Sequence, residues 1–368
     1  MPMYTSIDAT SPVGSLIGGN MLWYDLPLKE QNAIASDLAR RSFALHLEAC
    51  LPYRRYVDEV RATVGFDSIM EMPLITTSAF KSVELLSVGR ESIEKWCLSS
   101  GTSGNPSKVA RDRTTLSYLL SSTKVGAGLI GSWPEDDAVI VNLGSGGIES
   151  TIWFQYVVSL IELLYPSYAV EDNGSIEWCL VESLVSDHIG SGKHVVMIGP
   201  PYRVVDWLTY IAGTNRRMQC GSRCTIVTAG GWKKFSGSQI DRGSLTSLAM
   251  TQLCLHSEAQ VRDVFTQAEL NTVMFECVGL EKHVPPWVFV AARDPLTLTP
   301  CRDGELGVMS YIDASAESYP CLLLTEDLGY VRRGRCSCGR DGVRLHIERR
   351  LNSRPLAGCA VRMERHGV

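Results

Sequence analysis

A run of hydroxyl side chains, glycines and one lysine occupies residues 99–108, SSGTSGNPSK. Hydroxyls, backbone N–H groups beside flexible glycines, and a lysine can together bind the oxygens of a phosphate chain. The spacing does not fit a Walker loop, which needs four residues between its first glycine and Gly-Lys-Ser/Thr. A solvated turn would have a similar composition. The other motifs of the chain must therefore decide between a turn and a phosphate site.

A second glycine pattern, GAGLIG at residues 126–131, matches the dinucleotide-binding fingerprint literally. It ends the segment LSYLLSSTKVGAGLIG, which has the pattern of a helix and has no strand leading into the glycines. The fingerprint needs a strand directly before it and a helix after it. We therefore interpret these glycines as part of a helix.

The loop and its surroundings resemble a known family. SSGTSG followed by Lys108 resembles the phosphate loop of adenylate-forming enzymes, which include acyl-CoA ligases, adenylation domains and luciferases. VARDR, with Arg111 and Asp112, is similar more specifically to the acyl-protein synthetases of the LuxE type. Further segments follow in that family's order: MPLITTSAFKS at 72–82, TAGGWKK at 228–234, VFTQAEL at 264–270 and LLTEDLG at 323–329. The resemblance covers nearly the whole chain.

The resemblance implies a site for ATP and Mg²⁺. Lys108 would bind the β- and γ-phosphates, Asp327 would accept hydrogen bonds from the ribose hydroxyls, and Glu269 would be the catalytic metal ligand. The expected nucleotide contacts are Ser99, Ser100, Gly101, Thr102, Ser103, Gly104, Arg111, Gly230, Gly231, Trp232, Asp327 and Arg349. Taken singly, each charged residue could instead be a solvated side chain or a helix cap.

Adenylation joins a carboxylate to the α-phosphate and releases pyrophosphate, so it depends on cations and positioning more than on acid–base chemistry.

Two residues depart from the family pattern. Thr266 stands where glycine is usual and Ala268 where threonine is usual, and we expect both to weaken the affinity for magnesium or ATP.

The C-terminal part also departs from the wider superfamily. Full-length members carry a mobile C-terminal domain of roughly a hundred residues with an essential lysine, whereas the last lysine here is Lys282. We expect the missing cation to come from Lys233, Lys234 or a partner. Arg349 or Arg350 would supply the arginine that contacts ribose or phosphate.

Acyl-protein synthetases pass the acyl group from the adenylate to a cysteine near their C-terminus and then to a partner protein. Cys359, in LAGCAVRM, occupies the matching place and is our candidate nucleophile. Neighbouring arginines would lower the pKa of this thiol. The alternative is a structural cysteine, or a tail cysteine without a role.

Cys336 and Cys338, in RGRCSCGRDG, resemble a Cys-x-Cys-Gly-Arg turn of phenylacetate-CoA ligase relatives and acyl-protein synthetases. A zinc site would need two further ligands, for which Cys301, Cys321 and His346 are candidates that the spacing does not separate. We expect a tight turn with buried thiols rather than zinc.

Composition places these residues in an ordinary globular protein. The chain has 368 residues, of which 45% are hydrophobic and 20% charged, and its net charge is -5. Nucleic acid is therefore not an expected partner. The chain has no apolar run long enough to span a bilayer and no basic, apolar leader, which favours the cytoplasm. Twelve cysteines scattered among apolar residues are expected to be mostly buried thiols.

The expected elements alternate. Apolar runs that end in turns predict strands in DAVIVNLGSGG, KHVVMIGPP, CTIVTAGG and PPWVFVAARDP, and crossover helices in TIWFQYVVSLIELLY and PYRVVDWLTYIAG. The first ninety residues read as helical, with a break at Pro52. We expect an α/β fold: an adenylate-forming core of mixed sheets and packed helices at 1–328, and at 329–368 a short tail in place of the mobile domain.

These observations predict an enzyme that uses ATP to activate a carboxylic acid as an acyl-adenylate and transfers the acyl group to a thiol, its own cysteine or that of an acceptor or carrier protein. An acyl- or aryl-CoA ligase is the enzymatic alternative. A non-catalytic adenylate-binding scaffold is the alternative of another class, because Thr266, Ala268 and the missing lysine all depart from the catalytic pattern.

Overall fold

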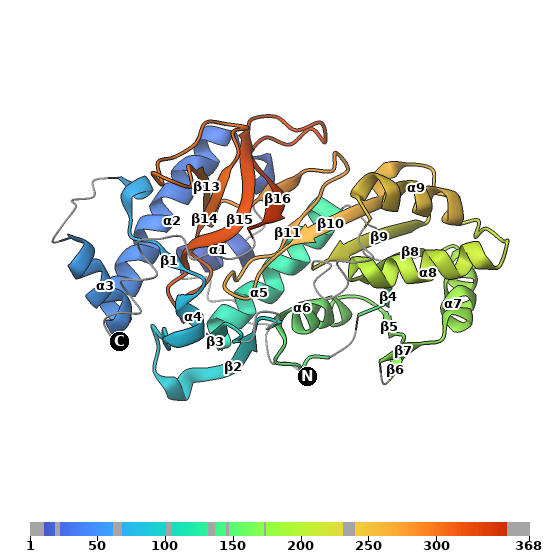
Figure 1. Ribbon diagram of the computed structural model, residues 1–368, viewed down its shortest axis with the longest axis horizontal. Helices are drawn as coiled ribbons and strands as arrows, with labels where there is room; N and C mark the ends of the chain where they lie inside the picture. The colour runs from blue at the N-terminus through green and yellow to red at the C-terminus, as the bar shows by residue number, and fades with distance from the viewer. Residues whose placement is uncertain are drawn as a thin grey trace. The chain divides into compact units, whose positions relative to one another are not determined.

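The computed structural model describes residues 11–18, 23–61, 68–100, 105–131, 137–144, 147–172, 174–230 and 240–351 (Figure 1). The chain divides into two compact units. Unit 1 comprises Met1–Ser122, Thr266–Met274 and Glu281–Val368, and unit 2 comprises Thr123–Phe265 and Phe275–Leu280. Each unit is built around its own large sheet.

The sheet of unit 2 is parallel at every pairing from β10 to β5. Its order is β11 (Met274–Phe275), β10 (Val261–Phe265), β9 (Cys224–Ala229), β8 (His194–Gly199), β4 (Ala138–Asn142) and β5 (Ser167–Ala169). Strands β4, β8 and β9 confirm three of the predicted strands. They are recognisable because a parallel strand covered on both faces is a nearly continuous apolar run.

Helices cover this sheet. They are α6 (Trp153–Glu162), α7 (Trp178–Gly190), α8 (Pro201–Gly213) and α9 (Arg242–Leu253). Helices α6, α7 and α8 pack on its strands, and the Trp207 ring of α8 lies fully buried in the apolar core. Helices α6 and α8 confirm the predicted crossovers. Helix α8 begins with Pro201, whose missing N–H would have no helical partner there anyway.

The GAGLIG segment continues a helix, as predicted. Helix α5 (Arg113–Val125) runs directly into a π-helical turn at Gly126–Gly131. A β-carbon on Gly126 would lie 2.6 Å from the Phe275 ring, so a close contact explains this glycine. The dinucleotide fingerprint is therefore coincidental.

The sheet of unit 1 is mainly antiparallel. Its order is β12 (Lys282–Val284), β16 (Val343–Arg350), β15 (Leu322–Arg333), β14 (Gly307–Asp313) and β13 (Val288–Arg293), with β1 (Ile75–Thr76) parallel to β15. Strand β13 confirms the fourth predicted strand. The expected boundary at residue 328 falls inside β15. Residues up to Arg350 belong to the sheet, because VRLHIERR alternates apolar and charged side chains as a strand does.

The remaining elements lie mostly towards the N-terminus. They are α1 (Pro12–Gly18), α2 (Leu28–Ala49), α3 (Leu51–Arg61), α4 (Ala79–Ser82), the hairpin β2 (Ile93–Leu98) and β3 (Lys108–Asp112), and the small hairpin β6 (Glu171–Asp172) and β7 (Ser175–Ile176). The helical N-terminus is confirmed, but its break is at Cys50. Pro52 lies in the first turn of α3, where a missing N–H is tolerated.

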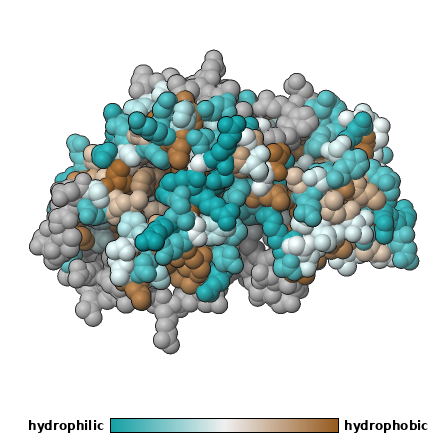
Figure 2. All heavy atoms as spheres, turned by 90° about the horizontal axis from the view of Figure 1, so that it is seen from above, coloured by the Kyte–Doolittle hydropathy of each residue, from teal (hydrophilic) through white to brown (hydrophobic). Residues whose placement is uncertain are grey.

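The surface is polar with separate apolar residues. Figure 2 shows hydrophilic side chains over much of one face, interrupted by smaller apolar patches.

Among the described cysteines Cys50 and Cys277 are buried as expected, whereas Cys179 is exposed. Scattered exposed apolar side chains are normal for a globular protein. In the part of the chain that the structure describes, no helix is both long and apolar enough to cross a membrane.

Candidate active site

The hydroxyl-rich run of residues 99–108 joins the two strands of the β2–β3 hairpin. The Ser99 N–H donates to the Ser107 carbonyl over 3.0 Å, and the Ser107 N–H donates to the Ser99 hydroxyl over 2.9 Å. Asn105 donates to the carbonyl of Lys81 over 3.0 Å, which anchors the run to α4. Ser100 is exposed beyond this closed stem. Residues 101–104, with four of the expected phosphate contacts, lie outside the described residues.

Lys108 begins the second strand of the hairpin, opposite Leu98. Its side chain is exposed, and its ammonium nitrogen lies 4.9 Å from the centre of the Trp96 ring. A cation over an aromatic face is attracted to it. The contact holds one positive charge at the base of the loop, at an accessible position.

Two buried carboxylates share an electrostatic environment in unit 1. Glu269 is 4% exposed and Asp327 is 8% exposed. Burial raises the pKa of Glu269, and a hydrogen bond with the Ser107 hydroxyl opposes this rise. Burial also raises the pKa of Asp327 from 3.8 to about 6; the Arg350 charge opposes the rise and the Glu269 charge adds to it. The predicted metal ligand and ribose ligand therefore lie near one another, although they are far apart in sequence.

Arg350 rather than Arg349 accompanies Asp327. In the β15–β16 ladder Asp327 lies opposite Arg350 and Leu328 lies opposite Arg349, and both arginines are exposed. Directly opposed residues of an antiparallel pair place their side chains on the same face of the sheet, so the register puts Arg350 beside Asp327. Arg350 also donates to the Glu326 carboxylate over 3.1 Å. The sequence left both arginines open, and the strand register selects Arg350.

Arg111 has a different place from the one expected. Its side chain is fully buried, and it donates to the carbonyls of Ala268 and Leu270 over 2.8 Å each and to the Asn271 amide oxygen over 3.0 Å. These bonds hold the backbone on both sides of Glu269. Arg111 is therefore a positioning residue for Glu269 and not an exposed nucleotide contact.

The sequence reasoning missed Asn271, which completes this buried network. Its amide group donates to the carbonyls of Thr115 and Ser315 over 2.8 and 3.0 Å. Its backbone N–H donates to the Asp313 carboxylate over 3.0 Å. Burial raises the pKa of Asp313. The sequence shows only that Asn271 is a polar residue next to the apolar Leu270. This pattern does not identify hydrogen-bond partners that lie far away in the sequence.

The two departures from the family motif have local roles. The Thr266 hydroxyl donates to the Thr272 carbonyl over 3.2 Å, which closes the loop that carries Glu269. Ala268 contributes its carbonyl to Arg111. Both residues therefore shape the loop around the carboxylate.

Two other motifs lie side by side in unit 1. Ile75 and Thr76, from the segment before the loop, pair in parallel with Leu323 and Leu324 at the start of the LLTEDLG segment. The Asp327 N–H, further along the same strand, donates to the Thr325 hydroxyl over 3.2 Å. Segments 72–82 and 323–329 therefore meet in one sheet.

The segment predicted to form the adenine-side turn, residues 228–234, belongs to unit 2 and is described as far as Gly230. Gly230 follows β9 with a φ of +77°, and a β-carbon there would lie 3.1 Å from the Phe154 ring. Both features favour glycine. Gly231, Trp232, Lys233 and Lys234 lie outside the described residues, as does Cys359.

The sequence of the whole chain matches one family. The family described as acyl-protein synthetase, LuxE, matches residues 13–366. The chain belongs to this acyl-protein synthetase family. It is 39% identical over 336 residues to a long-chain-fatty-acid–luciferin-component ligase of Aliivibrio fischeri, covering 91% of this chain and 89% of that one. It is 36% identical over 361 residues to the ligase of the same name from Vibrio harveyi, covering 97% and 94%.

Solved structures support the predicted fold. An open conformation of 2-hydroxyisobutyryl-CoA ligase in complex with 2-HIB-AMP and CoA has a TM-score of 0.70 with this acyl-protein synthetase. The likeness covers 89% of this chain and 72% of that one, at 15% sequence identity. At this identity the likeness shows the fold alone. The predicted α/β fold of an adenylate-forming core is confirmed.

Family membership also decides the class of activity. This acyl-protein synthetase is an acid–thiol ligase, which activates a carboxylic acid as an acyl-adenylate and transfers the acyl group to a thiol. The relatives are ligases, so the scaffold alternative is set aside.

Proposed function

We propose that unit 1 of this ligase binds ATP through the β2–β3 hairpin, Asp327 and Arg350, and binds Mg²⁺ through Glu269. One observation carries the proposal: Glu269 and Asp327 are buried carboxylates within electrostatic reach of each other, and Arg350 lies opposite Asp327 in the β15–β16 ladder. A carboxylate suits the two hydroxyl donors of a ribose. The exposed Lys108 and Ser100 would contact the phosphates, together with residues 101–104.

The carboxylates fit a magnesium ion. Mg²⁺ prefers one or two carboxylates together with phosphate oxygens, and Glu269 supplies such an oxygen. Burial raises the pKa of Glu269, so a nearby divalent charge would favour its ionised form. When bound, Mg²⁺ would neutralise charge on the phosphates. Arg111 and Asn271 would keep the backbone of the Glu269 loop in place.

The chemistry has two steps. A carboxylate oxygen of the acid attacks the α-phosphorus of ATP, and the bond to the leaving pyrophosphate breaks. A thiolate then attacks the acyl carbonyl carbon, the new carbon–sulfur bond forms, and AMP leaves with the electrons of the broken carbon–oxygen bond. Lys108 and Arg350 would stabilise the developing phosphate charge. We propose Cys359 as the first acceptor thiol, as in the family pattern.

We propose a long-chain fatty acid as the substrate and a protein thiol as the final acceptor. The names of the two relatives support this choice, because both are long-chain-fatty-acid–luciferin-component ligases. We also propose the cytoplasm as the location, because cysteines scattered among apolar residues suit a reducing compartment. The CoA ligase alternative predicts a different product, an acyl-CoA.

Substrate-dependent exchange tests the proposal. The full chain is incubated with ATP, Mg²⁺, labelled pyrophosphate and a panel of short, medium and long fatty acids and an aryl acid. We expect exchange with long-chain acids and no acyl-CoA when CoA is added. Exchange with the aryl acid alone, or stoichiometric acyl-CoA, would contradict the proposed substrate and acceptor.

A further inference from the structure

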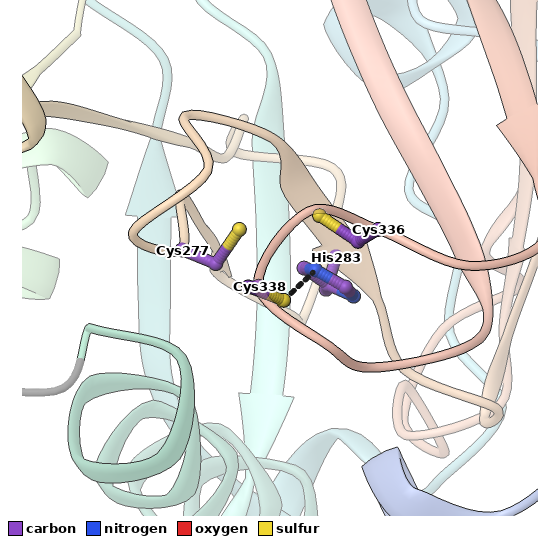
Figure 3. Close-up of side chains that lie close together, drawn as sticks. All are labelled: Cys277, His283, Cys336 and Cys338. Carbon is purple, nitrogen blue, oxygen red and sulfur yellow. Dashed lines mark hydrogen bonds between the residues drawn. The ribbon is translucent and has the colours of Figure 1, made fainter.

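Four side chains with sulfur or nitrogen atoms lie close together. They are Cys277, His283, Cys336 and Cys338 (Figure 3). One potential ligand atom from each lies within 4.8 Å of all the others. Cys338 Sγ and His283 Nε2 are 3.4 Å apart. Three of the four side chains are buried and Cys338 is partly exposed, so the cluster is largely screened from water.

The sheet brings three of these residues together. His283 is the middle residue of β12 and pairs with Arg344 of β16. Cys336 and Cys338 lie in the turn between β15 and β16, at the end of the same strand pair. The turn is closed by a bond of 2.8 Å from the Cys336 N–H to the Arg340 carbonyl, and Gly339 adopts a φ of +92°. The backbone thus presents both thiols to the histidine.

Cys277 reaches the cluster from a second tight turn. The Leu280 N–H donates to the Cys277 carbonyl over 2.9 Å, and the Gly279 N–H lies 3.3 Å from the Cys277 sulfur and donates to it. A backbone donor directed at sulfur favours the thiolate, because hydrogen bonds to charged acceptors are stronger. Leu280 has a φ of +58°, a costly conformation for a side chain other than glycine. This strained turn places Cys277 a few residues before His283.

We propose that Cys277, His283, Cys336 and Cys338 bind one structural zinc ion. Three thiolates and one imidazole form a typical ligand set for structural zinc. Bond lengths of about 2.3 Å to sulfur and about 2.0–2.1 Å to nitrogen give a tetrahedron with edges of roughly 3.4–3.8 Å. The 3.4 Å between Cys338 Sγ and His283 Nε2 is close to such an edge, and the other ligand atoms, all within 4.8 Å of one another, would draw together around the ion. Magnesium and calcium prefer oxygen ligands, so this cluster does not suit them.

The proposal differs from the expectation of a metal-free turn, and its ligands differ from the candidates Cys301, Cys321 and His346. The Cys321 thiol donates to the Glu269 carbonyl over 3.1 Å, and His346 Nε2 lies 3.3 Å from the Glu348 carboxylate. Cys301 is engaged with the Leu306 carbonyl. The available signal was CVGLEKH, in which a cysteine and a histidine stand close together, but the sequence gave no reason to join it to a turn far downstream.

Four protein ligands leave no open position, so the ion would have a structural role. The same turn contacts the start of α2, where the Leu28 N–H donates to the Asp341 carboxylate over 2.9 Å and Gln31 donates to the Asp341 carbonyl over 3.2 Å. Strands β15 and β16 lead from this turn to Asp327 and Arg350 at the other end of the ladder. Zinc would therefore stabilise the strand pair that carries the proposed ribose ligand.

Metal analysis of the full chain tests the site without depending on catalysis. We expect about one zinc per chain after purification, and an X-ray absorption spectrum with three sulfur ligands at about 2.3 Å and one nitrogen at about 2.0–2.1 Å. Cys338→Ser should weaken zinc affinity, measured by competition with a chelator, by about tenfold or more, because a lost ligand should cost at least as much as a lost outer-shell partner. Cys254→Ser, which alters a cysteine outside the cluster, should retain the wild-type zinc content.

Several results would overturn the proposal. They are wild-type protein that retains no zinc after zinc is supplied and the excess removed, a spectrum without sulfur ligands, or wild-type zinc affinity in Cys338→Ser. If Cys338→Ser does not fold, Co²⁺-loaded wild-type protein decides the matter. A sulfur-to-cobalt charge-transfer band with tetrahedral d–d bands supports the site, and the absence of such a band overturns it.

Discussion

Replacing Asp327 by asparagine should change the free energy of unfolding and the affinity for ATP in opposite directions, so the two roles of this carboxylate can be measured separately. Burial raises the pKa of Asp327 from 3.8 to about 6. The folded protein thus holds this proton more tightly than the unfolded chain. The group therefore destabilises the folded state as pH rises from about 4 to about 6. Keeping this carboxyl ionised at neutral pH therefore costs the folded state about 3 kcal/mol.

The variant should not be destabilised in this way, because asparagine has a similar shape to aspartate and carries no charge that must be buried. We expect Asp327→Asn to exceed wild type in free energy of unfolding by about 1–3 kcal/mol near pH 7, with the difference disappearing near pH 4. Urea unfolding across this range provides the measurement. Asp37→Asn is the matched control, since Asp37 forms an exposed pair with Arg41 that is worth at most about 0.5 kcal/mol.

Nucleotide binding should change in the opposite direction. Loss of a charged acceptor for the ribose costs about 1.5–3 kcal/mol, which weakens the affinity by roughly tenfold to a hundredfold. The wild-type affinity, relative to that of the variant, should increase from about pH 5 to about pH 7 as Asp327 ionises. Titration calorimetry with ATP measures both effects. A variant that is less stable at every pH and binds ATP as wild type does would refute the assignment.

Three other variants test the remaining roles. Lys108→Ala combined with Ser100→Ala should abolish pyrophosphate exchange and leave the unfolding curve unchanged, because both side chains are exposed; Lys193→Ala, at an exposed ion pair, should keep exchange near wild type. Arg111→Lys should lower the free energy of unfolding by about 3 kcal/mol in urea, since buried carbonyls lose their donors, and an unchanged midpoint would remove its positioning role. Cys359→Ser should retain exchange but lose the hydroxylamine-labile acyl-protein seen by mass spectrometry, whereas label on another cysteine would assign the transfer elsewhere.

The strands that could be predicted from the sequence are those whose apolar pattern lies within one short segment of the chain. Continuous apolar runs revealed β4, β8, β9 and β13, because buried strands need apolar side chains on both faces. The hydroxyl-rich loop was recognised by composition, and the structure adds that β2 and β3 form its stem.

Features that depend on register or on distant partners could not be predicted in this way. The choice of Arg350 over Arg349 follows from the pairing of two strands, which neither strand specifies alone. The burial of Arg111 depends on carbonyls far along the chain. The cluster of Cys277 and His283 with the later cysteines likewise forms only when β12 pairs with β16.

The most direct test of the central claim is acid-dependent pyrophosphate exchange by the full chain with ATP, Mg²⁺ and a long-chain fatty acid, in the absence of CoA. The account predicts exchange that requires the acid and that Asp327→Asn reduces by roughly tenfold or more at subsaturating ATP. Exchange that is absent with every acid, or equal in the wild type and the variant, would contradict it.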